Sequence, residues 1–275
     1  MNPTIQDAMA AAGLTPHKPL DLQANGKIHR YRVTGDKSGS VNGWAVLNDG
    51  AALFGGFGSW KTGESHTWRE ASSKPLTAAQ RAEIQRSTQV MRQAHALERD
   101  RVQAEARVKA QKLWERAKPT TNVHPYLERK RINAYGLRQL RDMLLVPARD
   151  VNGTLHTLQF ISADGSKRFL TGGRIAGCYF SIGRPIDSLL VAEGLATAST
   201  LYQATGRAVA VCFSCGNMAA VARALRLKFP SLKLILCADN DVNTPGNPGV
   251  TKAREAAQAV GGYLAIPKFG REAAL

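Results

Sequence analysis

The 275-residue chain carries 37 Lys and Arg residues against 21 Asp and Glu, which gives a formal net charge of +16. An excess of this size indicates a polyanionic partner, with nucleic acid ahead of an anionic membrane surface. The chain contains no stretch of about eighteen apolar residues, which excludes a membrane-spanning helix, so we expect no membrane partner. Residues 1–4 lack a basic region followed by an apolar core, so we expect no signal peptide and a cytoplasmic location.

Residues 1–72 predict a short helix over 5–12 followed by a small antiparallel β module. An Asn-Gly pair at 42–43 and an Asp-Gly pair at 49–50 are typical of hairpin turns between short apolar runs. The module contains three tryptophans: Trp44, Trp60 and Trp68. Their bulk favours a place in the core of a small domain, and base stacking on single-stranded nucleic acid is the alternative. No cysteine precedes Cys178, so we expect the module to be free of zinc.

Residues 73–118 predict a charged helical linker. Thr77 and Gln80 fit a capping box, and residues 78–117 contain neither Gly nor Pro. Large apolar residues are too sparse for a broad buried face, while strong helix formers and charges of both signs dominate. We expect one long or two shorter exposed helices that connect domains. A surface that tracks nucleic acid is the alternative.

Residues 119–187 predict an α+β unit. Pro119 ends the long helix, and a short basic helix follows at 124–132. A turn at 150–153 precedes an alternating strand over 154–161. A second turn leads to Lys167-Arg168-Phe169 and then to two glycines at 172–173.

Residues 188–266 alternate strands with helices and predict βαβ units with a parallel sheet. We expect strands at 188–192, 207–213, 232–237 and 263–266, with helices at 195–202, 218–227 and 250–260. Glu193, Asp239 and Asp241 follow two of these strands. Because ligands gather at the carboxyl ends of parallel strands, we expect the three carboxylates to meet at one edge. Their mutual repulsion calls for a cation, and oxygen-only ligands favour a hard ion such as Mg²⁺.

The Glu193-Gly194 pair and the Asp239-x-Asp241 pair, in this βα order, resemble the TOPRIM domain of bacterial primases, topoisomerases and some nucleases. The unit before it resembles the subdomain that precedes TOPRIM in primase cores, with a YL-x-x-(K/R)-x-I helix, a VP-x-x-D-x-x-G turn, a K-R-F strand and a GG loop. The residues that carry this second match are Tyr126, Leu127, Lys130, Ile132, Val146, Pro147, Asp150, Gly153, Lys167, Arg168, Phe169, Gly172 and Gly173. Lys130 stands where that pattern has Arg.

The resemblance implies a TOPRIM-like parallel sheet flanked by helices, preceded by an α+β subdomain and the β-rich module. The division it implies is 1–72, 73–118, 119–187 and 188–275. It also implies a DNA primase-like nucleotidyltransferase that copies single-stranded DNA from nucleoside triphosphates by two-metal catalysis with Mg²⁺ or Mn²⁺, with a replicative helicase as a further partner.

The residues to which this resemblance assigns roles are Glu193, Asp239 and Asp241 for metal and catalysis, and Lys130, Arg131, Lys167, Arg168 and Lys252 for nucleotide or nucleic acid. Glu193 could ligate metal or act as a general base. A metal-dependent nuclease and a non-catalytic single-strand-binding protein are the rival functions. Cys212 and Cys215 form a CxxC pair without a second ligand pair, so we expect buried structural thiols rather than a zinc or redox site.

Overall fold

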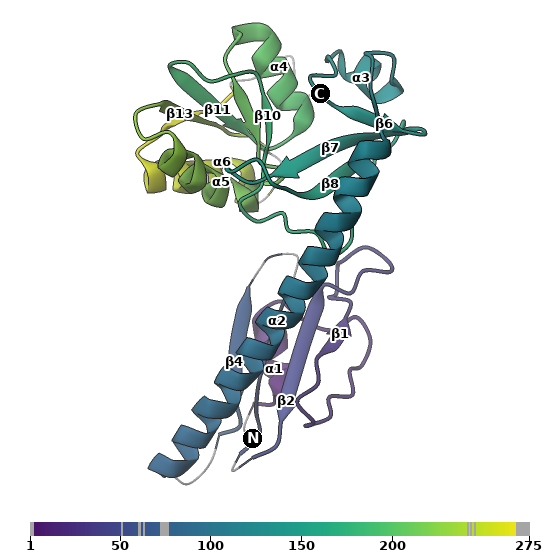
Figure 1. The fold of residues 1–275 in the computed structure, drawn as a ribbon. Coiled ribbons are helices and arrows are strands. Elements are labelled where there is room, and N and C mark those ends of the chain that lie inside the picture. Colours follow the sequence, from purple (N-terminus) through teal and green to yellow (C-terminus); the bar gives the residue numbers. More distant parts are fainter. Residues whose placement is uncertain are drawn as a thin grey trace. The chain divides into compact units, whose positions relative to one another are not determined.

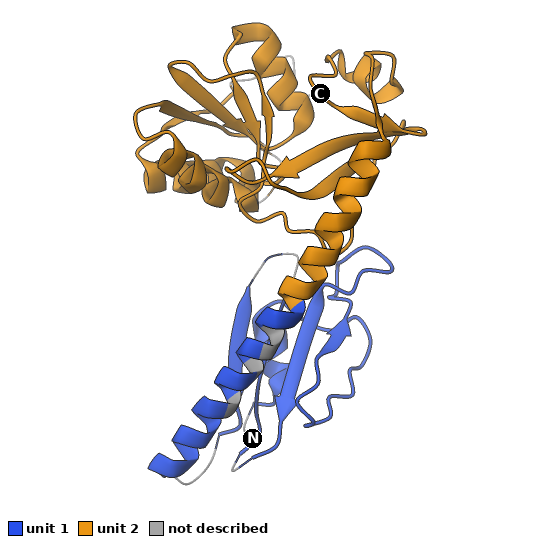
Figure 2. Cartoon of the chain, in the orientation of Figure 1, with its two compact units in different colours: residues 1–98 blue, residues 99–275 orange. Residues whose placement is uncertain are grey.

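The computed structural model describes residues 3–50, 52–59, 62, 64–71, 77–240, 242, 244 and 246–267, apart from the side chains of residues 87, 91, 94 and 95. The chain groups into two compact units, residues 1–98 and 99–275 (Figure 2). The finer four-part division remains a prediction. Within the described part of the chain, none of the helices combines the length and the apolar character that crossing a membrane requires.

The first unit is a short helix against a four-stranded antiparallel sheet, as predicted. Helix α1 (Ile5–Ala11) begins with a capping box, in which the Thr4 hydroxyl accepts a hydrogen bond from the Asp7 N–H and the Asp7 carboxylate accepts one from the Thr4 N–H. The strands β1 (His29–Tyr31), β2 (Gly43–Asn48), β3 (Phe54–Ser59) and β4 (Ser65–Arg69) pair in sequence order.

The tryptophans of this unit are not equivalent. Trp68 packs against a core that contains Met9, Leu47 and Phe57. Trp44 lies over Gly58, where an added Cβ would come within 2.9 Å of the indole ring. Trp60 lies outside the described residues. The core interpretation therefore holds for Trp68, while Trp44 covers a glycine on the sheet.

Helix α2 (Ala78–Arg116) begins at the predicted capping box, because Thr77 and Gln80 exchange side-chain-to-backbone hydrogen bonds of 3.0 and 3.2 Å. Its last turns are packed rather than exposed. Ala110 is fully buried, and Ala117, which directly follows the helix, is nearly so. Both belong to a core that also includes Leu113 and Trp114. Small alanines let a helix approach a sheet closely, and a count of large apolar residues overlooks them.

The second unit contains two five-stranded sheets. The first sheet is antiparallel, with β5 (Lys118–Pro119), β6 (Arg138–Leu140), β7 (Met143–Arg149), β8 (Leu155–Ile161) and β9 (Lys167–Phe169) in sequence order, and helix α3 (Pro125–Lys130) between β5 and β6. Trp114 of α2 packs with Leu145 and Leu158 on one face of this sheet.

The second sheet has the order β10-β12-β11-β13-β14. Strands β11 (Ser188–Ala192), β12 (Val209–Val211), β13 (Lys233–Cys237) and β14 (Tyr263–Ala265) are parallel, as predicted. Helices α4 (Leu195–Thr205), α5 (Cys215–Lys228) and α6 (Pro248–Val260) connect them. Strand β10 (Phe180–Ile182) adds an antiparallel edge by pairing with β12, and the sequence analysis did not predict this edge.

Each face of the parallel sheet has its own hydrophobic core. Helices α5 and α6 lie on one face of the sheet (Figure 1). They pack there through Met218, Leu225 and Ala253. On the other face Leu190 and Val209 share a core with α4, α3 and the antiparallel sheet. The two sheets of the second unit are therefore held together by one continuous apolar layer.

Three of the four cysteines are buried thiols. Cys178, Cys212 and Cys237 are buried, whereas Cys215 is partly exposed in the first turn of α5. All four are free, and burial raises the pKa of Cys237 to about 11. A raised pKa keeps a thiol protonated and unreactive near neutral pH, which agrees with a structural role.

Asn217 of α5 ties the glycine-rich loop before β10 to the parallel sheet. Its side-chain amide donates to the carbonyls of Ile175, Cys178 and Cys212 at 3.1, 3.0 and 2.9 Å, and its oxygen accepts from the Gly177 N–H at 2.8 Å. The Ile175 carbonyl also accepts from the Cys178 N–H at 2.8 Å, whereas without Asn217 the carbonyls of Cys178 and Cys212 would lose this donor in a largely buried position.

We expect Asn217→Asp to lower the free energy of unfolding by about 2 kcal/mol, because a carboxylate cannot donate to the carbonyls of Cys178 and Cys212. Urea denaturation followed by circular dichroism measures the change. Asn152→Asp, at an exposed turn position, is the matched control and should unfold like the wild type. Equal stability of the two variants would contradict this account of the loop.

Candidate functional site

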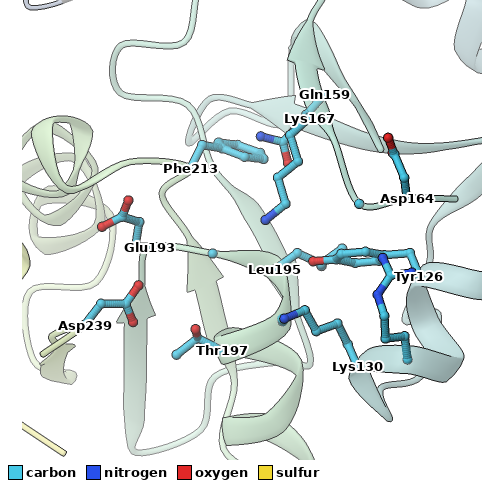
Figure 3. Close-up of a pocket in the computed structure, with 14 residues that line it drawn as sticks. Tyr126, Lys130, Gln159, Asp164, Lys167, Glu193, Leu195, Thr197, Phe213 and Asp239 are labelled. Atoms are coloured by element: carbon cyan, nitrogen blue, oxygen red, sulfur yellow. The ribbon is translucent and has the colours of Figure 1, made fainter. Parts of the chain in front are cut away.

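A cleft of about 580 Å³ opens where the two sheets of the second unit meet (Figure 3). One wall comes from the carboxyl ends of β11 and β13, and the other from α3, β8 and β9. The residues that line it are Tyr126, Arg129, Lys130, Gln159, Asp164, Gly165, Lys167, Glu193, Gly194, Leu195, Ala196, Thr197, Phe213 and Asp239. An acidic wall thus faces a basic one.

The acidic wall holds Glu193 and Asp239, as predicted. Glu193 directly follows β11 and Asp239 follows β13, and these two strands are parallel neighbours, with Ala192 paired to Cys237. Figure 3 shows the two carboxylates side by side at the strand ends. Asp241 lies outside the described residues. No group of three metal-binding side chains forms among the residues that are described.

The chain beyond β13 is held by close backbone packing. An added Cβ at Gly249, in the first turn of α6, would lie 2.3 Å from the carbonyl oxygen of Asp239, so only glycine fits there. Asn247 donates to the side-chain oxygen of Asn240 at 2.8 Å, and Asn240 donates to the carbonyl of Pro267 at 3.1 Å. These contacts fix the position from which Asp239 enters the cleft.

The basic wall presents Lys130 at the end of α3 and Lys167 at the start of β9 (Figure 3). Lys167 lies 5.7 Å from the ring centre of Tyr126. Partial burial lowers the pKa of Lys167, and attraction by Glu193 and Asp239 raises it less. Burial disfavours the charged ammonium, so a negatively charged ligand in the cleft would restore the lost stabilisation.

The other three predicted basic residues do not line this cleft. Arg168 alternates with Lys167 along β9 and projects from the opposite face, where its guanidinium lies 5.3 Å from the Phe160 ring centre. Arg131 caps α3 with a left-handed backbone (φ 54°) and is exposed. Lys252 forms a 2.9 Å ion pair with Glu255 on the surface of α6.

The cleft also holds residues to which the sequence assigned no functional role. Phe213 follows β12 with a positive φ of 70°, which is costly for a residue with a side chain, and it packs edge-on against Phe169 at 5.5 Å. The one feature of the sequence that could have pointed to Phe213 is its position just after a strand. Arg129 donates to the carbonyl of Ala163 at 3.0 Å, and Gln159 lies on β8.

Tyr126 carries a polar atom that the protein leaves unsatisfied. The residue is 2% exposed, and its hydroxyl has no hydrogen-bond partner among the described residues. Figure 3 shows this hydroxyl on the cleft side of the ring. Buried polar groups of proteins are nearly always paired, so this hydroxyl is placed to donate to a ligand bound in the cleft.

The comparisons with known proteins agree with this architecture. Residues 188–267 match the family model of the Toprim domain. Two DNA primases TraC of Escherichia coli are similar: one is 35% identical over 89% of this chain and 24% of its own length, the other 33% identical over 96% and 19%. The chain therefore spans about a quarter or less of these curated relatives.

Solved primase structures overlap more loosely. The primase fragment of the bacteriophage T7 primase-helicase protein is 15% identical, with a TM-score of 0.40, over 52% of this chain and 64% of that one. A DNA primase domain from Pseudomonas aeruginosa is 18% identical, with a TM-score of 0.33, over 48% and 45%. At this level of overlap we draw no conclusion from them.

The parallel sheet, the carboxylates at its strand ends and the family match identify residues 188–267 as a Toprim domain. The similarity to the TraC primases reaches beyond this domain and extends over most of the chain.

We expect Tyr126→Phe to raise the free energy of unfolding by about 1 kcal/mol, since it removes a buried hydroxyl that has no partner. Urea denaturation measures the change. Tyr31→Phe is the matched control, because the Tyr31 hydroxyl is buried and donates to the Leu14 carbonyl at 2.9 Å. That variant should lose about 1 kcal/mol. A loss in both variants would show that Tyr126 is satisfied within the protein.

At the rim of the cleft, hydrogen bonds from Ser162 and Ser166 lower the pKa of Asp164 from its usual 3.8 to about 2. A lowered carboxyl pKa contributes stability that is present above pH 3.8 and is lost as the pH falls towards 2. We expect Ser162→Ala to raise this pKa, as measured by NMR titration of the carboxyl carbon. The pKa of Asp7, lowered by its bonds with Thr4, is the internal control and should stay unchanged.

Proposed function

We propose that this protein acts as a DNA primase-like nucleotidyltransferase, making short oligonucleotides on a single-stranded DNA template. The observation that carries the proposal is the pairing of Glu193 and Asp239 at neighbouring strand ends across a cleft from Lys130 and Lys167. A nucleoside triphosphate needs both kinds of wall, because its phosphates carry negative charge and its reacting phosphorus requires stabilisation.

The donor chemistry of the acidic wall fits a divalent cation. Glu193 and Asp239 offer only carboxylate oxygens, which suit Mg²⁺ or Mn²⁺, and we propose Asp241 as a third contributor. Bound there, a pair of such ions would supply charge stabilisation to the attacking and leaving oxygens. The Tyr126 hydroxyl faces the same cleft and would donate to a ligand oxygen.

The basic wall would orient the triphosphate. Lys130 and Lys167 extend into the cleft (Figure 3), and Arg129 also lines it. In the proposed step, the 3′-hydroxyl oxygen of the growing strand bonds to the α-phosphorus while the bond to pyrophosphate breaks. The hydroxyl proton passes to water or to Glu193 as a general base. An anion beside Lys167 would favour its charged ammonium and so oppose the burial that lowers its pKa.

Two further assignments rest on the resemblance to primases. Arg131, Arg168 and Lys252 lie outside the cleft, so we propose them for the nucleic-acid backbone rather than for the triphosphate. We also propose a replicative helicase as a partner of a primase of this class. The rival activity is metal-dependent phosphodiester cleavage, which would use the same carboxylates with water as the nucleophile.

The test is oligonucleotide synthesis from labelled ribonucleotides and deoxyribonucleotides on single-stranded DNA with Mg²⁺ or Mn²⁺. We expect Asp239→Asn and Glu193→Gln each to reduce the rate by about 100-fold or more, since even residues that support metal ligands contribute 10- to 100-fold. Asp187→Asn is the matched control, because this exposed carboxylate precedes β11 at the opposite end of the sheet.

Synthesis by the wild type and the Asp187 variant, but not by the other two, would support the proposal. Metal-dependent cleavage of the template without incorporation would replace it with the nuclease. Strand binding without either activity, unchanged by all three substitutions, would leave a non-catalytic binding protein.

A further inference from the structure

A second groove of about 580 Å³ lies between the C-terminal turns of α2 and the β7–β8 hairpin. It shares no lining residue with the cleft. Arg107 and Lys112 of α2 form one side, and Arg149, Thr154 and the buried Leu155 form the other. The groove therefore has an apolar floor between two cationic sides.

Two arginines in the region of this groove, Arg138 and Arg149, have little negative charge beside them. Arg138 and Arg149 lie 4.6 and 5.8 Å from the ring centre of the same residue, Trp114. Their described hydrogen bonds go to backbone carbonyls: Arg138 donates to Trp114 at 2.6 Å and Arg149 to Gly153 at 2.9 Å. Across the described part of the chain, neither guanidinium forms an ion pair with a carboxylate. The acidic residue in the lining, Glu115, accepts a hydrogen bond from Gln111.

In the absence of a ligand, the surroundings of Arg149 disfavour its positive charge. Burial lowers the pKa of Arg149, and the neighbouring charge of Arg138 lowers it further. Two like charges on one indole ring repel each other, and partial burial removes the water that would screen them. An anion in the groove would offset both costs, and phosphate oxygens match the fork of a guanidinium.

The positive surface continues along the same face of the antiparallel sheet. Arg168 pairs with Phe160, and Phe160 pairs with Leu145. Directly paired residues point to the same side, so Arg168 shares the face that Leu145 buries against α2. Cations repeated along one face suit a chain of phosphates better than a single small anion.

We propose that the groove between α2 and the β7–β8 hairpin binds the phosphodiester backbone of nucleic acid at a place separate from the catalytic cleft. Arg107, Lys112 and Arg149 contact the phosphates, and the base sequence is not read. The choice of nucleic acid as the polyanion rests on the proposed function and on the net charge of +16, whereas the anion site rests on the groove itself.

The test is fluorescence anisotropy of the full chain with a short labelled single strand and with the matching duplex, over a series of salt concentrations. We expect Arg149→Gln and the double variant Arg107→Gln/Lys112→Gln to bind more weakly. The slope of log affinity against log salt should become shallower by about 0.7 per lost phosphate contact for a single strand and about 0.9 for a duplex. Arg223→Gln, an exposed position on α5 outside the groove, is the matched control.

Weaker binding of the single strand alone assigns the groove to the template, and weaker binding of the duplex assigns it to the product. The double variant changes two exposed residues of a helix surface, so it remains folded even where Arg149→Gln disturbs the hairpin. Wild-type affinity and salt slope in both variants, with both kinds of DNA, would overturn the proposal. Asp239→Asn separates the two proposals, because it removes synthesis without weakening binding in the groove.

Discussion

The apolar layer between the two sheets of the second unit is the constraint on which the candidate site depends. Leu144, Val146 and Ile161 of the antiparallel sheet share one core with Leu190 and Val209 of the parallel sheet. Burial of this surface holds the acidic strand ends and the basic wall at a set separation. Charged groups could not hold that geometry alone, because exposed ion pairs contribute little and water screens them.

The antiparallel sheet serves two proposed sites because side chains alternate along a strand. In β9, Lys167 enters the cleft while Arg168 projects from the opposite face. Arg149 of β7 lies on that second face, beside Trp114 of α2. A nucleic acid that reaches both faces would be held at the reacting end by the cleft and along its backbone by the groove. In these proposals, the residues of the cleft carry out the reaction, and different residues, those of the groove, bind the nucleic-acid backbone.

Several features followed from the sequence because their causes are local. The capping box of Thr77 and Gln80 depends on residues three apart, and the predicted helix begins there. The alternation of apolar runs and helical stretches after residue 188 predicted the four parallel strands, since strand and helix periods differ. It also predicted that Glu193 and Asp239 would meet, because the carboxyl ends of parallel strands share one edge. The roles of these residues in catalysis stay predictions.

Other features depended on contacts between segments far apart in the chain. The short strand β10 exists because it pairs with β12, and Ala110 is buried because α2 crosses a sheet that forms from later residues. The face taken by Arg168 follows from the pairing register of β9, which residue type does not encode. The sequence by itself thus determined the order of the elements and the edge where the carboxylates gather. Only the tertiary structure decided which cations face them and where the second groove lies, because long-range packing and register set the direction of each side chain.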